Sequence, residues 1–281
     1  MESGDLEMAF ETIRVEHGAV TTITLNRPQT RNAMSRQMVE ELMQALEAAN
    51  SDEAVRVIVL RGTGGHFCAG ADIADMARAR SEGDGTPQAL ARINRGFGHL
   101  ISAFDASPKT VVAVLEGAVL GGGLGLACVA DITISRADAR LGLPEATLGL
   151  VPAQIIPFVV GRVGLSQARY LALTARRIDG TEAFRIGLVH ELADGSEALE
   201  VRLDDLLDKT LHCAPMAART TKALLLATRE MPTESLLDHG AKQFAELAAG
   251  EEAMEGATAF MQKRKPTWAA ERAARKEQEE G

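Results

Sequence analysis

The chain has 281 residues, of which 46% are hydrophobic and 4% aromatic, so it can build one large aliphatic core or two small ones. Its formal net charge of −9 argues against nucleic acid as a partner, because phosphate binding needs a basic surface. Three cysteines supply neither a disulfide framework nor a metal cluster, so we expect no metal site. The acidic start (residues 1–11) does not resemble a signal peptide, and no apolar run reaches the roughly 18 residues of a membrane span, so we expect a cytoplasmic protein without a membrane partner.

Strand and helix signals alternate through the first half of the chain. The β-branched alternation over 19–25 predicts a strand, and Ser35 is a suitable N-cap for a helix over 37–50. The short apolar run at 55–60 is typical of a buried strand. The other elements predicted here are a turn at 62–65, a mobile surface loop at 81–88, a helix at 89–106, a strand at 110–115, a helix from Gly121 to Val129 and a strand at 131–135. This order favours an α/β fold.

Strand signals vanish after about residue 203. Helical patterns cover 203–211, 214–230, 233–250 and 251–263. The tail, 268–281, is nearly all alanine and charge, which predicts a solvated or frayed helix. We therefore expect an α/β core over 1–200 and a helical region over 201–281.

Two glycine-rich stretches, 64–73 and 117–123, each follow a predicted buried strand. Small residues there let another backbone or a ligand approach closely. A helix that begins in the second stretch also directs free amides and a positive dipole end into the same space. Two converging amides can bind a developing oxyanion. Taken singly, each stretch is equally consistent with glycines that only permit tight helix–strand packing.

Taken together, the two stretches resemble the crotonase (enoyl-CoA hydratase/isomerase) family. The sequence Phe-Cys-Ala-Gly-Ala-Asp-Ile at 67–73 matches its signature, as does 117–123 followed by Ala130-Asp131-Ile132. Further matches are Leu25-Asn26-Arg27-Pro28, Arg31-Asn32-Ala33-Met34, Leu143-Pro144-Glu145, Leu148-Gly149-Leu150, Ala183 and Gly187-Leu188-Val189. The motifs follow the family's order and spacing over roughly residues 8–268.

The resemblance implies a spiral of ββα units and C-terminal helices that form homotrimers, often paired into hexamers. It implies an acyl-CoA thioester as substrate, with no cofactor beyond that coenzyme A. By position, Ala69 and Gly122 would supply the two amides that bind the thioester oxygen. The other substrate-binding positions that it implies are Arg27 and Arg31 near the phosphates, Ala33, Asp72 and Ile73 on the adenine side, Ala71, Gly121 and Gly125 in the glycine-rich stretches, and Phe260 and Lys263 reaching a neighbouring subunit's coenzyme A. The basic residues 263–265 can equally be a solvated charge cluster.

Hydration also needs a base for water and an acid for the α-carbon. Typical hydratases of this family use two glutamates, whose positions here hold Gly125 and Glu145. Glu145 lies among apolar neighbours, which would raise its pKa, and one carboxyl could add water and then return the proton. The alternative is that Glu145 is only a carboxylate at a helix start behind Pro144.

A single glutamate at this position also occurs in family members that move a double bond, so an isomerase remains an alternative. Residues 149–158 replace the usual glycine-rich loop and resemble the branch that hydrates glutaconyl-type acyl-CoAs, such as methylglutaconyl-CoA or isohexenylglutaconyl-CoA, in leucine and acyclic-terpenoid breakdown. Gly125 would then leave room for a bulky substrate or an extra water. Gln154 could bind that water or a distal carboxylate, or be a plain turn residue. A third alternative, a non-catalytic binding protein, is disfavoured because Ala69, Gly122 and Glu145 are all present.

Overall fold

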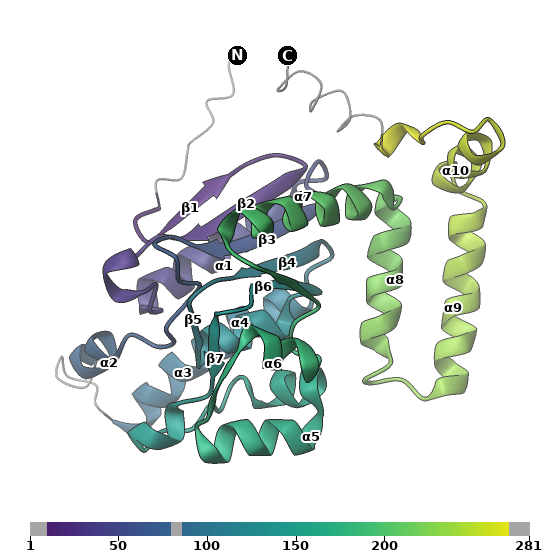
Figure 1. The fold of residues 1–281 in the computed structure, drawn as a ribbon. Coiled ribbons are helices and arrows are strands. Elements are labelled where there is room, and N and C mark those ends of the chain that lie inside the picture. Colours follow the sequence, from purple (N-terminus) through teal and green to yellow (C-terminus); the bar gives the residue numbers. More distant parts are fainter. Residues whose placement is uncertain (1–9, 80–85, 270–281) are drawn as a thin grey trace, which may run out of the picture.

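A six-stranded sheet forms the centre of the molecule (Figure 1). The computed structural model describes residues 10–79 and 86–269, so the predictions for the first nine residues, for 81–85 of the loop and for 270–281 of the tail lie outside it. The strand order is β1 (Ile13–Glu16), β2 (Val20–Leu25), β3 (Val57–Gly62), β4 (Thr110–Leu115), β6 (Ile132–Arg136) and β9 (Glu191–Ala193). Only the β1–β2 pair is antiparallel. The apolar runs of β3 and β4 are buried, as expected for strands covered on both faces.

A smaller, three-stranded sheet runs beside the large one. We call it the ladder, and it carries the second strand of the ββα units. It contains β5 (Ala118–Leu120), β7 (Arg140–Gly142) and β8 (Arg177–Asp179). Two isolated parallel bridges, Cys68 with Val119 and Met34 with Ala71, extend the pairing to earlier segments of the chain. Successive units thus place one strand in the large sheet, one segment in the ladder and a helix outside. This arrangement confirms the predicted α/β fold of ββα units.

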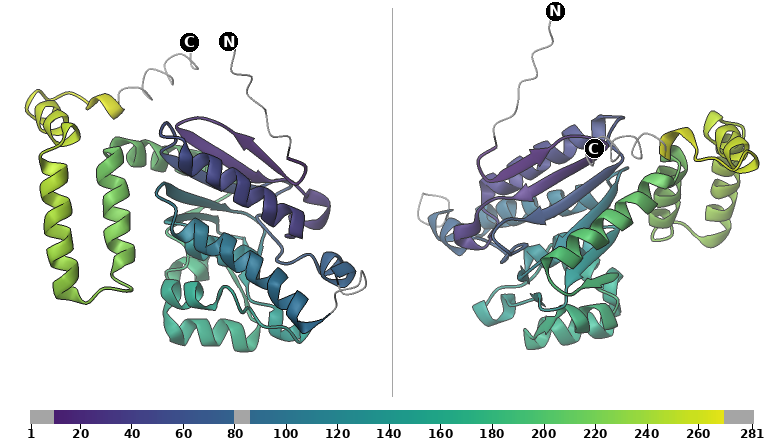
Figure 2. Two further views of the ribbon diagram at one scale, coloured as in Figure 1. Left: turned by 180° about the vertical axis from the view of Figure 1, so that it is seen from behind. Right: turned by 45° about the horizontal axis from the view of Figure 1, so that its top comes forward.

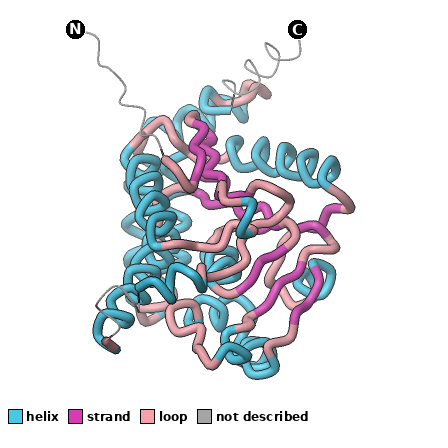
Figure 3. Tube along the Cα trace, turned by 90° about the vertical axis from the view of Figure 1, so that its left-hand side faces the viewer, coloured by secondary structure: helices cyan, strands magenta, loops and turns pink. Residues whose placement is uncertain are grey.

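Helices cover both faces of the large sheet (Figures 1 and 3). On one face lie α1 (Arg36–Ser51), α3 (Pro87–Asp105) and α4 (Gly122–Val129). Helix α5 (Ile156–Thr174) packs on α4, and the short helices α2 (Ile73–Ala79) and α6 (Gly180–Arg185) lie nearby. The predicted cap of α1 is confirmed, because the Ser35 hydroxyl accepts the Met38 amide at 3.2 Å. On the other face, α7 (Ser196–His212) buries leucines such as Leu199 and Leu203 against β3, β4 and β6.

The last helices form an arm that projects from the sheet, consisting of α8 (Pro215–Ala227), α9 (Thr233–Ala248) and α10 (Glu251–Met261) (Figures 1 and 2). Lys222 of α8 ties the arm to the sheet through Asp131, with Nζ 2.7 Å from Oδ2. Neither α8 nor α9 buries a residue within the chain. The arm instead exposes large apolar side chains, namely Leu225, Leu237, Phe244, Met254, Phe260 and Met261. Over the described ranges 10–79 and 86–269, we find no helix with both the length and the apolar character to cross a bilayer.

Candidate active site

The two glycine-rich stretches lie side by side because the chain pairs them as short parallel strands. The Cys68 amide donates to the Ala118 carbonyl at 2.8 Å, and the Leu120 amide donates back to the Cys68 carbonyl at 2.9 Å. This pairing aligns residues 67–71 with β5 and with the start of α4, which follows directly. Close approach of two backbones, rather than tight helix packing alone, is therefore what these stretches provide.

Ala69 is not the free donor that the sequence motif led us to expect. Its amide shares a planar trans peptide with the Cys68 carbonyl, and the two groups of such a peptide point in opposite directions. Because the Cys68 carbonyl points toward Leu120, the Ala69 amide points the other way and donates to the Arg31 carbonyl at 3.0 Å. The assignment of Ala69 to the oxyanion hole is therefore wrong.

The amide of Ala71 has the orientation that Ala69 lacks. Gly70 has φ +98°, a left-handed conformation that favours glycine, and its carbonyl turns to accept the Met34 amide at 2.8 Å. The Ala71 amide therefore points away from Met34, toward the side where Gly121 approaches Gly70 closely. Within the described residues the Ala71 amide has no hydrogen-bond partner.

The second free amide belongs to Gly122, the first residue of α4. First-turn amides have no partner inside a helix, and the N-cap residue, Gly121, has no side chain to supply one. The Gly121 amide itself is occupied by the Gly142 carbonyl at 3.0 Å. The positive end of the helix dipole adds to the attraction for negative charge at this point. The two candidate oxyanion donors are therefore the amides of Ala71, which replaces Ala69, and of Gly122, which is kept from the sequence prediction.

Glu145 lies against this pair of amides. It begins a 3₁₀ helix, Glu145–Leu148, and a Cβ atom on Gly121 would lie only 2.8 Å from its Oε1. Its Oε2 is buried and has no hydrogen-bond partner among the described residues. Burial raises the pKa of Glu145 above that of an ordinary glutamate, as the sequence predicted. The carboxyl group is thus poised to exchange a proton with a bound molecule.

The space beside Gly125 is filled. A Cβ atom on Gly125 would overlap Ile155 Cγ2, lie 3.0 Å from Ile155 Cβ and approach Ile101 Cδ1 at 3.5 Å. The interpretation that Gly125 leaves room for a bulky substrate or an extra water is therefore wrong. Ile155 occupies the volume that a longer side chain at position 125 would need, so Glu145 has no carboxyl partner from this helix.

Helix α3 forms a wall of the site that the sequence analysis did not anticipate. A Cβ atom on Gly122 would lie 3.0 Å from Phe97 Cζ and 2.8 Å from Met34 Cε, so these two side chains flank the Gly122 amide. Gln154 also packs on α3, over Gly98, and its Nε2 donates to Asn94 Oδ1 at 2.8 Å. The available signal was an isolated glycine inside a helical pattern, which often marks a close packing partner.

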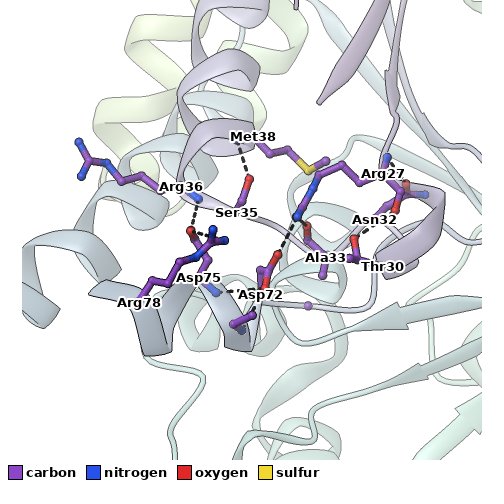
Figure 4. Close-up of polar contacts among 12 residues, drawn as sticks. Arg27, Thr30, Asn32, Ala33, Ser35, Arg36, Met38, Asp72, Asp75 and Arg78 are labelled. Atoms are coloured by element: carbon purple, nitrogen blue, oxygen red, sulfur yellow. Dashed lines mark hydrogen bonds and ion pairs between the residues drawn. The ribbon is translucent and has the colours of Figure 1, made fainter. Parts of the chain in front are cut away.

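An ion pair holds the loop at 27–34 against the start of α2 (Figure 4). Arg27 Nη2 lies 2.8 Å from Asp72 Oδ2, and its Nη1 donates to the Ala33 carbonyl at 2.6 Å. Asp72 also accepts the amides of Ala74 and Asp75. Burial acts to raise the pKa of Asp72, but the Arg27 guanidinium and these amides together hold it below the usual value. Arg27 is therefore engaged by Asp72 and by the Ala33 carbonyl within the chain, and its place near a phosphate stays a prediction.

Asn32 also holds the loop at 27–34 in place, a role that the sequence analysis missed. Its side chain is fully buried, donates to the carbonyls of Thr63 and His66, and accepts the Arg27 amide. Asn32 thereby joins the loop at 27–34 to the turn that leads into residues 67–71, and so helps to position the Ala71 amide.

Replacing Asp72 with asparagine is expected to lower the free energy of unfolding by about 3 kcal/mol, because it leaves a largely buried guanidinium without its counter-charge. Urea denaturation measures this value. The matched control is Glu40→Gln, which breaks an exposed ion pair with Arg36 and should cost less than about 1 kcal/mol. Equal losses for the two variants would contradict the structural role of the Arg27–Asp72 pair.

The other predicted coenzyme A positions fall into two groups. Ala33 and Ile73 flank the Met34–Ala71 bridge, and Arg31 is exposed with no side-chain partner among the described residues. Phe260 lies in α10 and Lys263 follows it, and Figure 1 shows α10 in the arm, apart from α4 and β7, which border the candidate site. Phe260 is 85% exposed. A single chain therefore does not bring these last two residues to the site.

The chain is similar to many proteins along nearly its whole length. A family model described as enoyl-CoA hydratase/isomerase matches residues 15–271. Among solved structures, AtuE of Pseudomonas aeruginosa is 55% identical with a TM-score of 0.89, covering 92% of this chain and 100% of that chain. An enoyl-CoA hydratase/isomerase from Marinobacter aquaeolei is 49% identical with a TM-score of 0.88, covering 92% and 99%. The 2,3-dehydroadipyl-CoA hydratase of Escherichia coli (strain K12) is 35% identical over 251 residues, which are 88% of this chain and 94% of that protein. The chain therefore belongs to the enoyl-CoA hydratase/isomerase family, and its two-sheet core with C-terminal helices is the crotonase fold.

Proposed function

We propose that this enoyl-CoA hydratase adds water across the 2,3 double bond of a branched, glutaconyl-type acyl-CoA, with Glu145 as its only carboxyl catalyst. The observation that carries the proposal is the placement of an unpartnered, buried carboxyl oxygen beside two free backbone amides. Enoyl thioester hydration requires donors that stabilise the developing oxyanion and a group that accepts and donates a proton, and these residues offer both.

The chemistry follows from these positions. The amides of Ala71 and Gly122 hold the thioester oxygen and stabilise the negative charge that it gains. The Glu145 carboxylate takes a proton from water as the water oxygen bonds to the β-carbon, which forms the enolate. The same carboxyl group then returns that proton to the α-carbon, and the double bond becomes saturated. The raised pKa of Glu145 suits this cycle, since the group must both accept and donate.

The substrate class is supported by residues 149–158, which resemble the branch that hydrates glutaconyl-type acyl-CoAs. Such substrates arise in the breakdown of leucine and of acyclic terpenoids, and we place the enzyme in one of these pathways. Arg31, Ala33 and Ile73 would contact the coenzyme A portion, because they border the Ala71 side of the oxyanion site.

The test is to mix the purified enzyme with 3-methylglutaconyl-CoA, crotonyl-CoA and a 3-enoyl-CoA in ¹⁸O-labelled water. We expect the enoyl absorbance to fall with the 2-enoyl substrates and one labelled oxygen to enter each product. The alternative function, double-bond isomerisation, is favoured by the single carboxyl of the site. It predicts conversion of the 3-enoyl-CoA with no label in the product, and that result without any hydration would overturn the proposal.

We further propose that the enzyme assembles as a trimer or as a pair of trimers through the arm. The apolar side chains exposed on α8, α9 and α10 support this, and the assembly would let Phe260 and Lys263 reach a neighbouring subunit's coenzyme A. Light scattering after size exclusion should give three or six times the 29.9 kDa of the chain. A monomeric mass would contradict the assembly and the role of both residues.

A further inference from the structure

A small polar cluster lies on α3 beside the segment that precedes α5. It consists of Asn94, Arg95 and Gln154. Gln154 Nε2 donates to Asn94 Oδ1 at 2.8 Å, and Arg95 Nη1 lies 3.5 Å from Gln154 Oε1. Both Gln154 and Arg95 lie over Gly98, where a Cβ atom would overlap Gln154 Oε1 and lie 2.6 Å from Arg95 Nη1. The bare helix surface at Gly98 is what allows the guanidinium and the amide to meet there.

The charge of Arg95 is not balanced by its surroundings. A guanidinium stays protonated at any pH at which the protein is folded. Within the described stretches of the chain, the guanidinium of Arg95 pairs with no carboxylate, and its hydrogen-bond partner is the neutral Gln154 oxygen at the outer limit of bonding distance. The bond to Asn94 orients the Gln154 side chain, and the Gln154 oxygen gives the exposed Arg95 guanidinium one neutral contact.

The cluster lies next to the oxyanion site. Phe97 follows Arg95 by two residues on α3 and packs against Gly122. Arg95 extends over Gly98, the residue that follows Phe97 in α3. Its partner Gln154 precedes Ile155, which contacts Gly125 one turn into α4. A five-carbon acyl chain extends about 5 Å beyond its thioester carbon, at an advance close to that of an extended backbone. The far end of such a chain therefore lies beyond the oxyanion site, against which the segment of α3 that carries Arg95 packs.

We propose that Arg95, positioned by Gln154 and Asn94, binds a carboxylate at the distal end of the acyl group. This inference rests on the proposed function, since it identifies the group that distinguishes a dicarboxylic acyl-CoA from a plain one. The planar guanidinium offers two parallel donors that match a carboxylate, and such charge-assisted bonds are about twice as strong as neutral ones. Arg95 is thus a specificity-determining residue, while the proton chemistry stays with Glu145.

The experiment measures binding and not turnover. Glutaryl-CoA and pentanoyl-CoA have equal carbon counts and no double bond, so neither can be hydrated, and only glutaryl-CoA carries the distal carboxylate. Calorimetry gives the Kd of each for the wild type, Arg95→Met, Gln154→Glu and Arg169→Met. Arg169 is an exposed arginine near the C-terminal end of α5, whereas Gln154 precedes the N-terminal end of that helix. The Arg169 variant therefore controls for the loss of one positive charge.

We expect the ratio of the pentanoyl-CoA Kd to the glutaryl-CoA Kd to fall about 10- to 100-fold in Arg95→Met. Gln154→Glu should lower the ratio similarly, because the new carboxylate would pair with the Arg95 guanidinium. Arg169→Met should leave the ratio unchanged. An unchanged ratio in Arg95→Met, or an equal loss for both ligands, would overturn the inference.

The two proposals fail in distinguishable ways. A wild-type enzyme that prefers glutaryl-CoA but hydrates no enoyl-CoA would retain the carboxylate site and refute the hydration. A wild-type enzyme that hydrates enoyl-CoA but binds the two saturated ligands equally would keep the proposed hydration and refute the carboxylate site.

Discussion

Replacing Glu145 with glutamine is expected to lower kcat for enoyl-CoA hydration by about 10³- to 10⁴-fold, with KM little changed. Glutamine keeps the shape of the side chain but can neither take a proton from water nor return one, and each such transfer contributes about 10²- to 10⁴-fold. Initial rates at the enoyl absorbance band measure the loss. Glu47→Gln, on the exposed face of α1, is the matched control and should retain full activity.

The pH profile of the wild type provides an independent check on this assignment. In the proposed reaction the carboxylate form of Glu145 takes the first proton, so kcat/KM should rise with pH through a pKa that burial has raised above that of an ordinary glutamate. This limb should vanish in the residual activity of Glu145→Gln. The raised pKa also means that the ionised group lowers folding stability above that pKa, so the variant should unfold no more easily than the wild type near neutral pH. A glutamine variant with wild-type kcat would refute the role of Glu145.

Replacing Gly122 with proline is expected to lower kcat by about 100- to 1,000-fold, because it removes one of the two amides that we propose bind the thioester oxygen. Proline is tolerated at the first position of a helix, where no intrahelical bond is lost, so α4 should still form. The measurement is again the hydration rate, together with circular dichroism to confirm that the fold is retained.

Gly122→Ala is the matched control for the proline variant. It adds the same Cβ atom, whose nearest neighbours are the Met34 methyl group and the edge of the Phe97 ring, but it keeps the amide. The difference between the two variants therefore isolates the N–H group. If both variants lose activity equally, the loss is steric and Gly122 is not an oxyanion donor.

The sequence placed the two glycine segments and Glu145 together through the family resemblance that their motifs carry. It was not sufficient to choose between Ala69 and Ala71. That choice depends on which carbonyl pairs with which distant strand, and on the left-handed turn at Gly70 that reverses the amide after it. Peptide orientation is a property of the paired backbone, so a motif that contains two alanines leaves it undetermined.

The sequence also showed that position 125 lacks a carboxylate without showing what takes its place. Ile155 fills that volume from a segment thirty residues further along the chain. Arg27 illustrates the same limit, since its charge suggested a ligand but its partner, Asp72, is supplied by the protein. Contacts between segments that are far apart in sequence decide whether a space or a charge is available to a ligand. The periodic pattern of apolar residues does not reveal such contacts.

The bridges that join residues 34, 71, 68 and 119 have a consequence for how activity is lost. The two oxyanion amides lie on chain segments about fifty residues apart, and only the completed parallel pairing brings them to one point. Such long-range pairs form late and open together as one cooperative unit. Any partial opening that separates residues 67–71 from β5 removes the oxyanion site as a whole while most helices stay intact. Hydration activity therefore reports on the closure of this ladder more sensitively than helix content does.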